Sequence, residues 1–262
     1  MKILTSGAAW SALMLMVAGT VQAGVKTKLV EYKQGDATLE GYLAWDDAAN
    51  GKRPGVLVAH AWMGIGPHER AVAEQLARLG YVAFCADIYG KGIRAASPEE
   101  AGKQAGIYKA DRALTRARVS AALEQLRANP SVDAKRVAAI GYCFGGMVAL
   151  ELARSGADVA GVVVFHGDLS NPKPDDDKNI KAKVLALQGG DDPYVPAPAV
   201  AAFEQQMRSA GVDWQLVQYG GAVHAYTDPG AGTDNSKGAA YNARADGRSW
   251  QAMKDFFGEL FK

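Results

Sequence analysis

Short uninterrupted apolar runs alternate with helix-length amphipathic segments from residue 55 onward, and this alternation restricts the fold more than any other feature. Such runs suit strands that are buried on both faces, as in a parallel sheet covered by helices. The expected strands are residues 56–60, 82–85, 137–141, 159–165, 184–188 and 214–219, and the expected helices lie near residues 68–79, 103–128, 144–154, 197–210 and 239–261. The pattern predicts an α/β fold with a mostly parallel, doubly wound sheet and right-handed crossovers.

Residues 25–32 and 38–45 have strand character on either side of a Gln34-Gly35-Asp36 turn. We expect them to form an antiparallel hairpin at one edge of the sheet. No internal repeat or low-complexity linker divides the chain after it, so residues 24–262 are expected to form a single domain. The polar segment 172–177 is interpreted as solvated surface, and the glycine-rich segment 220–238 is long enough to predict a functional loop.

The first 23 residues have the pattern of a secretory signal peptide. Lys2 supplies a positive start, residues 8–18 are apolar and uncharged, and small residues precede Gly24. The apolar run is shorter than the roughly 20 residues that a membrane-spanning helix needs. We therefore expect cleavage after Ala23 and a periplasmic or secreted protein that has no membrane attachment.

The charge balance gives no support for a nucleic-acid partner, because 29 basic residues face 28 acidic ones and no polybasic run is present. No set of Cys, His and Asp residues has convincing metal spacing, and Gly141, Gly145 and Gly146 lack the Lys and the spacing of a phosphate-binding loop. We expect no cofactor, no metal and a monomer. The only cysteines are Cys85 and Cys143, and a disulfide between them would block the Cys143 thiol.

The stretch Gly141-Tyr142-Cys143-Phe144-Gly145 joins an expected strand to an expected helix. It matches the nucleophile elbow, in which small flanking residues let the strand and the helix approach each other around a strained nucleophile. The dipole of the following helix lowers a thiol pKa and favours an anion nearby. The backbone N–H of Phe144 can form half of an oxyanion hole. A buried cysteine in a tight turn is the simpler alternative.

Two further polar groups follow expected strands in the order that hydrolases of this kind use: nucleophile, acid, histidine. One strand ends before Gly189-Gly190-Asp191-Asp192-Pro193, and a later one before Gly220-Gly221-Ala222-Val223-His224. The carboxyl ends of parallel strands meet at the edge where ligands bind in open α/β sheets. Cys143, Asp192 and His224 therefore form a candidate catalytic triad.

With GYCFGG, GGDDPYVP and GGAVHAY in place, the chain resembles the dienelactone hydrolases of the α/β-hydrolase fold over about residues 25–261. The resemblance implies Cys143 as nucleophile, His224 as base and Asp192 as the acid that orients it. Asp192 is preferred over Asp191 because the acid of this family lies four residues before a proline, which here is Pro196. It also implies that a small ester or lactone is the substrate.

Two further assignments rest on the same resemblance, and the remaining histidines are interpreted from their positions in the sequence. The second oxyanion N–H belongs to Trp62, two residues beyond His60. The segment from Asp87 to Lys91 corresponds to a substrate-binding stretch, which makes Lys91 and Tyr89 candidate substrate contacts. His166 ends a strand at the catalytic edge and is either a pocket residue or, with more weight, a structural one. His60 is interpreted as a packing or site-lining residue and His68 as a surface residue.

The chain departs from the founding members of this family at three positions. Ala61 stands where they have a glutamate that takes part in activating the cysteine. Lys91 replaces an arginine that grips the substrate carboxylate, and Asp228 stands near the position of the second arginine, where its charge would repel an anion. We therefore expect a neutral ester, lactone or thioester as substrate in place of dienelactone.

Two other functions stay open at this point. The missing acid at position 61 fits a hydrolase-fold protein that binds a small molecule with little or no turnover. A redox role for Cys85 and Cys143 is the third possibility. An ester assay on the wild type and on Cys143→Ala separates the first two.

Overall fold

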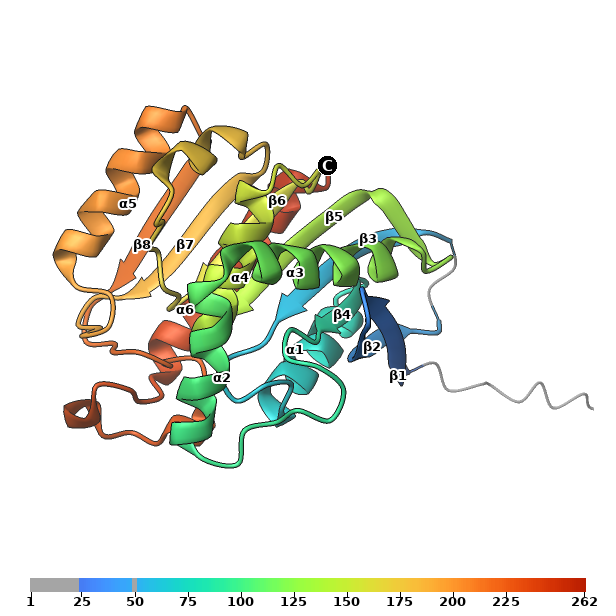
Figure 1. Cartoon of the computed structure of the whole chain (residues 1–262), viewed down its shortest axis with the longest axis horizontal. Helices are drawn as coiled ribbons and strands as arrows, with labels where there is room; N and C mark the ends of the chain where they lie inside the picture. The colour runs from blue at the N-terminus through green and yellow to red at the C-terminus, as the bar shows by residue number, and fades with distance from the viewer. Residues whose placement is uncertain (1–23, 49–50) are drawn as a thin grey trace, which may run out of the picture.

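The computed structural model describes residues 24–48 and 51–262, so the expected signal peptide lies outside the described residues. In the described part, eight strands form one sheet in the order β1-β2-β4-β3-β5-β6-β7-β8 (Figure 1). The strands are β1 (Val25–Gln34), β2 (Ala37–Asp46), β3 (Arg53–Ala59), β4 (Val82–Ala86), β5 (Val132–Tyr142), β6 (Gly161–Phe165), β7 (Lys183–Gly189) and β8 (Trp214–Tyr219). The helices are α1 (Pro67–Arg78), α2 (Pro98–Ala110), α3 (Arg112–Arg127), α4 (Phe144–Arg154), α5 (Ala197–Ala210) and α6 (Ala243–Leu260).

The sheet is mixed, as expected. β1 and β2 form an antiparallel hairpin, and β2 pairs with β4 antiparallel. Every other neighbouring pair, from β4–β3 to β7–β8, is parallel. The α/β-hydrolase fold and the N-terminal hairpin predicted from the sequence are therefore confirmed.

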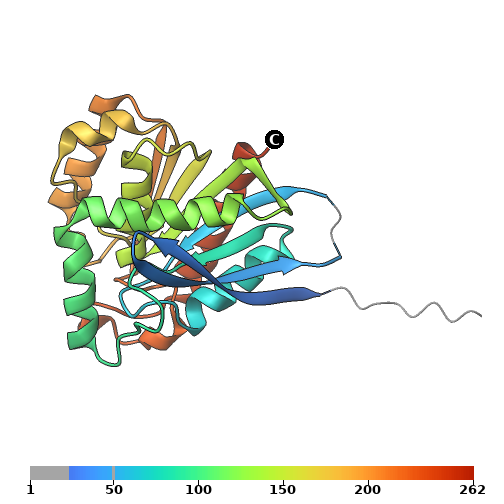
Figure 2. The same ribbon diagram turned by 45° about the vertical axis from the view of Figure 1, so that its right-hand side comes forward.

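Helices cover both faces of the sheet, which explains why its central strands are apolar throughout. Every residue of β4 and β6 is buried. α3, α4 and α5 contribute to the core on one face, whereas α1 and α6 contribute to the core on the other. Figure 2 shows α3 in front of the sheet, with α1 and α6 behind it. No helix among the described residues is long and apolar enough to cross a membrane.

The expected single helix over residues 103–128 is wrong, because the chain forms α2 and α3 with a break at Asp111. Asp111 leaves the helical conformation, with φ −112° and ψ 87°, and its carboxylate accepts the Leu114 N–H at 2.9 Å. An aspartate in this position caps the helix that follows it. The amphipathic pattern continues across the break, which is why periodicity alone joined the two helices.

The segment 172–177 is only partly the solvated surface that we expected. A 3₁₀ turn spans Pro174–Asn179, and within it Asp177 is buried. The Asp177 carboxylate accepts a 2.8 Å bond from Arg154 Nε, and Arg154 also donates to Glu151 at 3.2 Å. All three side chains are at most 1% exposed. Of the three consecutive aspartates, Asp177 is therefore buried and neutralises the charge of Arg154 on α4.

We expect Arg154→Ala to lower the free energy of unfolding by about 3–5 kcal/mol, because it leaves the buried Asp177 carboxylate without its cation. Urea denaturation measures the loss. Lys178→Ala is the matched control, since Lys178 pairs with Asp175 at the exposed surface. Equal stability of Arg154→Ala and the wild type would mean that the buried pairs contribute no net stabilisation.

Candidate active site

Cys143 lies between β5 and α4 in a conformation that the flanking glycines make possible. Its φ is 54° and its ψ −116°, a strained combination for a residue with a side chain. A Cβ on Gly141 would lie 1.9 Å from the Gly145 carbonyl oxygen, and a Cβ on Gly145 would lie 2.2 Å from the Ala59 carbonyl oxygen. The first turn of α4 therefore packs directly on the ends of β5 and β3, as a nucleophile elbow requires.

Asp192 and His224 come from the loops after β7 and β8. Asp192 is buried, and its Oδ2 lies 2.8 Å from His224 Nδ1. Its other oxygen accepts the Tyr194 N–H at 2.8 Å. Asp191 is exposed and accepts the Gly221 N–H instead. Of the two adjacent aspartates, the structure brings Asp192 to the histidine.

The His224 imidazole lies next to Cys143 as well as Asp192. Burial lowers its pKa, but hydrogen bonds to Asp192 and Cys143, together with their charges, outweigh this and raise the pKa of His224 to about 10. The raised pKa favours the imidazolium form of His224 at neutral pH, next to the Asp192 carboxylate.

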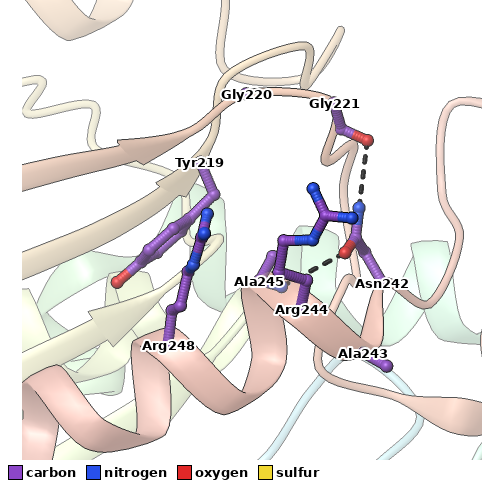
Figure 3. A pocket seen from close by; sticks show the side chains of 8 residues that line it. All are labelled: Tyr219, Gly220, Gly221, Asn242, Ala243, Arg244, Ala245 and Arg248. Carbon is purple, nitrogen blue, oxygen red and sulfur yellow. Dashed lines mark hydrogen bonds between the residues drawn. The ribbon is translucent and has the colours of Figure 1, made fainter.

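The long loop predicted at residues 220–238 carries His224 and is fastened to α6. The Gly221 carbonyl accepts the Nδ2–H groups of Asn235 and Asn242, both at 3.1 Å. Asn242 also caps α6, because its side-chain oxygen accepts the Ala245 N–H (Figure 3). A small hollow that Arg244 and Arg248 border lies beside this cap. His224 itself forms a parallel bridge with Ala239. These bonds fix the position of the His224 backbone relative to α6.

Cys143 and His224 open into a cavity of about 1300 Å³. Its walls come from the loop after β3, from α1 and α6, from both ends of α2 and from the segment 225–231. Trp62, His166 and Asp228 line it. Glu69, Asp168 and Asp246 add carboxylates to the walls, and Lys109 adds a cation.

Lys91 and Tyr89 do not line this cavity. Lys91 forms an ion pair with Glu31 at the surface, with both side chains well exposed. Tyr89 is buried, and its hydroxyl donates to the Trp62 carbonyl at 2.8 Å. The structure therefore places Tyr89 behind the Trp62 loop and leaves Lys91 outside the site, so neither is positioned as a substrate contact.

The Phe144 and Trp62 N–H groups are both available near the thiol. Phe144 opens α4, where the first N–H groups have no helical acceptor. Trp62 lies in the turn after β3, and no hydrogen bond from its N–H to another described residue is present. Trp62 and Cys143 line the same cavity. Both N–H groups are therefore candidate donors for an oxyanion hole.

The other histidines differ in their surroundings. His166 is buried, its Nε2 lies 2.8 Å from Thr227 Oγ1, and its ring centroid is 5.2 Å from that of His224. Burial, then the charges of His224 and His68, hold the pKa of His166 well below its usual range. His68 is half-buried in the cavity wall against Tyr142, so it is not the surface residue that we expected.

Glu69 is the site residue that the sequence analysis missed. It is buried on the first turn of α1, where its carboxylate accepts the Ala61 N–H at 3.0 Å and the Gly66 N–H at 2.8 Å. A glutamate three residues after the start of a helix is a known capping signal, but Gly66 stands here in place of the usual Ser or Thr. The Glu69 carboxylate on α1 thus reaches the backbone N–H of Ala61.

Cys85 and Cys143 are both free thiols. Cys85 is buried on β4, and burial raises its pKa well above the usual range. Its Sγ donates to the Glu69 carbonyl at 3.3 Å. The disulfide that the sequence left open is absent from the described chain. No cluster of three metal-ligating side chains occurs among the described residues.

Comparison with known proteins agrees with this geometry. The model of the dienelactone hydrolase family matches residues 39–261. A putative carboxymethylenebutenolidase from Synechocystis sp. is 29% identical over 89% of this chain and 96% of its own length. The solved structure named m3DLH is 41% identical and covers 91% of this chain and 100% of its own, with a TM-score of 0.88.

A second solved structure is the dienelactone hydrolase-like promiscuous phosphotriesterase P91 from metagenomic libraries. It is 40% identical and covers 91% of this chain and 100% of its own, with a TM-score of 0.87. The family match extends over nearly all of the sheet and over the three loops that carry Cys143, Asp192 and His224. The chain belongs to the dienelactone hydrolase family and is a carboxylic-ester hydrolase of the α/β-hydrolase fold.

Proposed function

We propose that the protein hydrolyses small neutral esters or lactones with Cys143 as nucleophile and His224 and Asp192 as its partners. The observation that carries this proposal is the 2.8 Å bond between Asp192 and His224 beside the strained Cys143, at the floor of a large cavity. The thiolate attacks the substrate carbonyl carbon, and the carbonyl oxygen becomes an oxyanion. The N–H groups of Phe144 and Trp62 stabilise this charge.

The tetrahedral intermediate then expels the alcohol as its C–O bond breaks, and the His224 imidazolium gives the alcohol its proton. The neutral imidazole next takes a proton from water, which attacks the thioester carbonyl. When the C–S bond breaks, the acid product leaves and the pair returns to thiolate and imidazolium. Asp192 keeps the Nδ1–H tautomer of His224 and stabilises its charged form in both halves of the reaction.

The charges around the cavity favour a substrate without a carboxylate. Asp228, Asp168, Asp246 and Glu69 line it. Lys109 also lines it but pairs with Asp168 at 3.7 Å, and Lys91 lies outside. An anionic substrate would meet these carboxylates without an arginine pair to compensate. A neutral phosphotriester is a further candidate substrate, because the 40% identical P91 protein is described as a promiscuous phosphotriesterase.

Replacing the nucleophile tests the proposal directly. We expect Cys143→Ala to lower kcat for p-nitrophenyl acetate by about 10³-fold or more, since no acyl-enzyme can form. Iodoacetamide treatment of the wild type should abolish activity in parallel, and Cys85→Ala is the matched control that should stay active. A wild type with no activity towards esters, lactones or the phosphotriester under reducing conditions would instead support a binding protein with little or no turnover.

The raised pKa of His224 predicts the shape of the pH profile. Because the imidazolium must protonate the leaving alcohol, kcat/KM should hold through neutral pH and fall as pH rises through about 10. In Asp192→Asn the carboxylate no longer raises the His224 pKa, so the fall should begin at lower pH. A wild-type kcat/KM that climbs steadily up to pH 10 would show that the neutral imidazole is the reactive form.

Removing the Asp228 charge tests the substrate preference. We expect Asp228→Asn to raise kcat/KM for a carboxylate-bearing lactone by roughly threefold to tenfold, the effect of one nearby charge in a wet site. The value for p-nitrophenyl acetate should stay the same. Lys91→Ala is the control and should leave kcat/KM unchanged for both substrates. Faster turnover of the anionic lactone than of neutral esters by the wild type contradicts the neutral preference.

A further inference from the structure

The peptide that joins Ala61 to Trp62 is held by its carbonyl group. The Ala61 oxygen accepts hydrogen bonds from His60 Nδ1 at 2.7 Å and from the Gly64 N–H at 3.1 Å. The same peptide carries the Trp62 N–H. In a trans peptide the N–H and C=O bonds point in opposite directions, so a clamp on one fixes the direction of the other.

The tautomer of His60 follows from its second contact. The Ile88 N–H donates to His60 Nε2 at 3.3 Å, so Nε2 must be the acceptor and Nδ1 must carry the proton. His60 is fully buried, and this burial lowers its pKa. Its ring therefore stays neutral and bridges Ile88 to the Ala61 carbonyl with one defined hydrogen-bond polarity.

We propose that His60 is a positioning residue that aims the Trp62 N–H at the oxyanion by holding the Ala61 carbonyl. This inference rests on the proposed function, in which the Trp62 N–H stabilises the developing charge. His60 does not touch the substrate in this scheme: it is enclosed, and it acts through the peptide.

Neighbouring bonds restrain the peptides on either side. Glu69 accepts the Ala61 N–H at 3.0 Å, and the Tyr89 hydroxyl donates to the Trp62 carbonyl at 2.8 Å. The His60 ring also packs edge-on against Tyr89 at 4.7 Å and stacks on Phe144 at 5.8 Å, between ring centroids. His60 therefore contacts Phe144, which carries one candidate donor, and the carbonyl of the peptide that carries the other. A rotation of the 61–62 peptide would break both bonds to the Ala61 carbonyl.

Two substitutions of nearly equal shape separate hydrogen bonding from packing. His60→Asn keeps an amide N–H close to the position of Nδ1, whereas His60→Leu has no donor there. Both lose the acceptor for the Ile88 N–H. We expect His60→Leu to lower kcat for p-nitrophenyl acetate roughly 10- to 100-fold with little change in KM, and His60→Asn to recover most of that loss.

The rate of Cys143 alkylation by iodoacetamide is the second readout, because that reaction needs the thiolate but forms no oxyanion. It should be equal in the wild type and both variants. Equal kcat in His60→Leu and His60→Asn overturns the inference, as does a parallel loss of alkylation rate, which would mean a distorted elbow. If His60→Leu does not fold, His60→Gln replaces it, since its amide lies one bond further out and should be the slower of the two polar variants.

The two proposals fail in different ways. Activity that persists in Cys143→Ala contradicts the proposed nucleophile, whatever the His60 variants do. An active, Cys143-dependent wild type whose His60→Leu variant keeps full kcat contradicts the role of His60 and leaves the proposed function intact.

Discussion

The close approach of α4 to the ends of β3 and β5 is the constraint on which the rest of the site depends. Gly145 lies against the Ala59 carbonyl, and Gly141 lies against Gly145, at distances that no side chain allows. Ala59 and Gly141 are also direct partners in the sheet. The same contact therefore sets the strained turn at Cys143 and the starting point of the loop that carries Trp62. The thiol and both candidate oxyanion donors share one rigid origin, as preorganised electrostatic stabilisation requires.

Three histidines near this origin are given different protonation states by their surroundings. Burial acts to lower the pKa of His224, but its interactions with Asp192 and Cys143 raise it to about 10, whereas burial keeps the pKa values of His60 and His166 low. These states support one another. A second imidazolium at His166, with its ring 5.2 Å from His224, would repel the charge that Asp192 stabilises. Of these three histidines, the raised pKa belongs to His224, which transfers the proton in the proposed mechanism.

Local patterns in the sequence were enough to predict the sheet, the hairpin and the grouping of Cys143, Asp192 and His224. Each of these residues follows an apolar strand, and parallel strands bring such residues to one edge. Contacts between distant segments were not predictable in this way. The family resemblance implied that Lys91 lies near the substrate, but Lys91 pairs with Glu31 of the hairpin at the surface instead. Asp177 seemed solvated because its neighbours are polar, although Arg154 from another element buries it.

The alanine at position 61 can now be interpreted together with Glu69. The Glu69 carboxylate accepts the N–H groups of Ala61 and Gly66, one on each oxygen. Its contribution under the proposed mechanism is to hold the oxyanion loop. Under the same mechanism, activation of Cys143 falls to His224, whose pKa is raised. With alanine at position 61, the proposed mechanism divides two tasks between separate groups. Glu69 on α1 fixes the loop, and His224 with Asp192 activates the nucleophile.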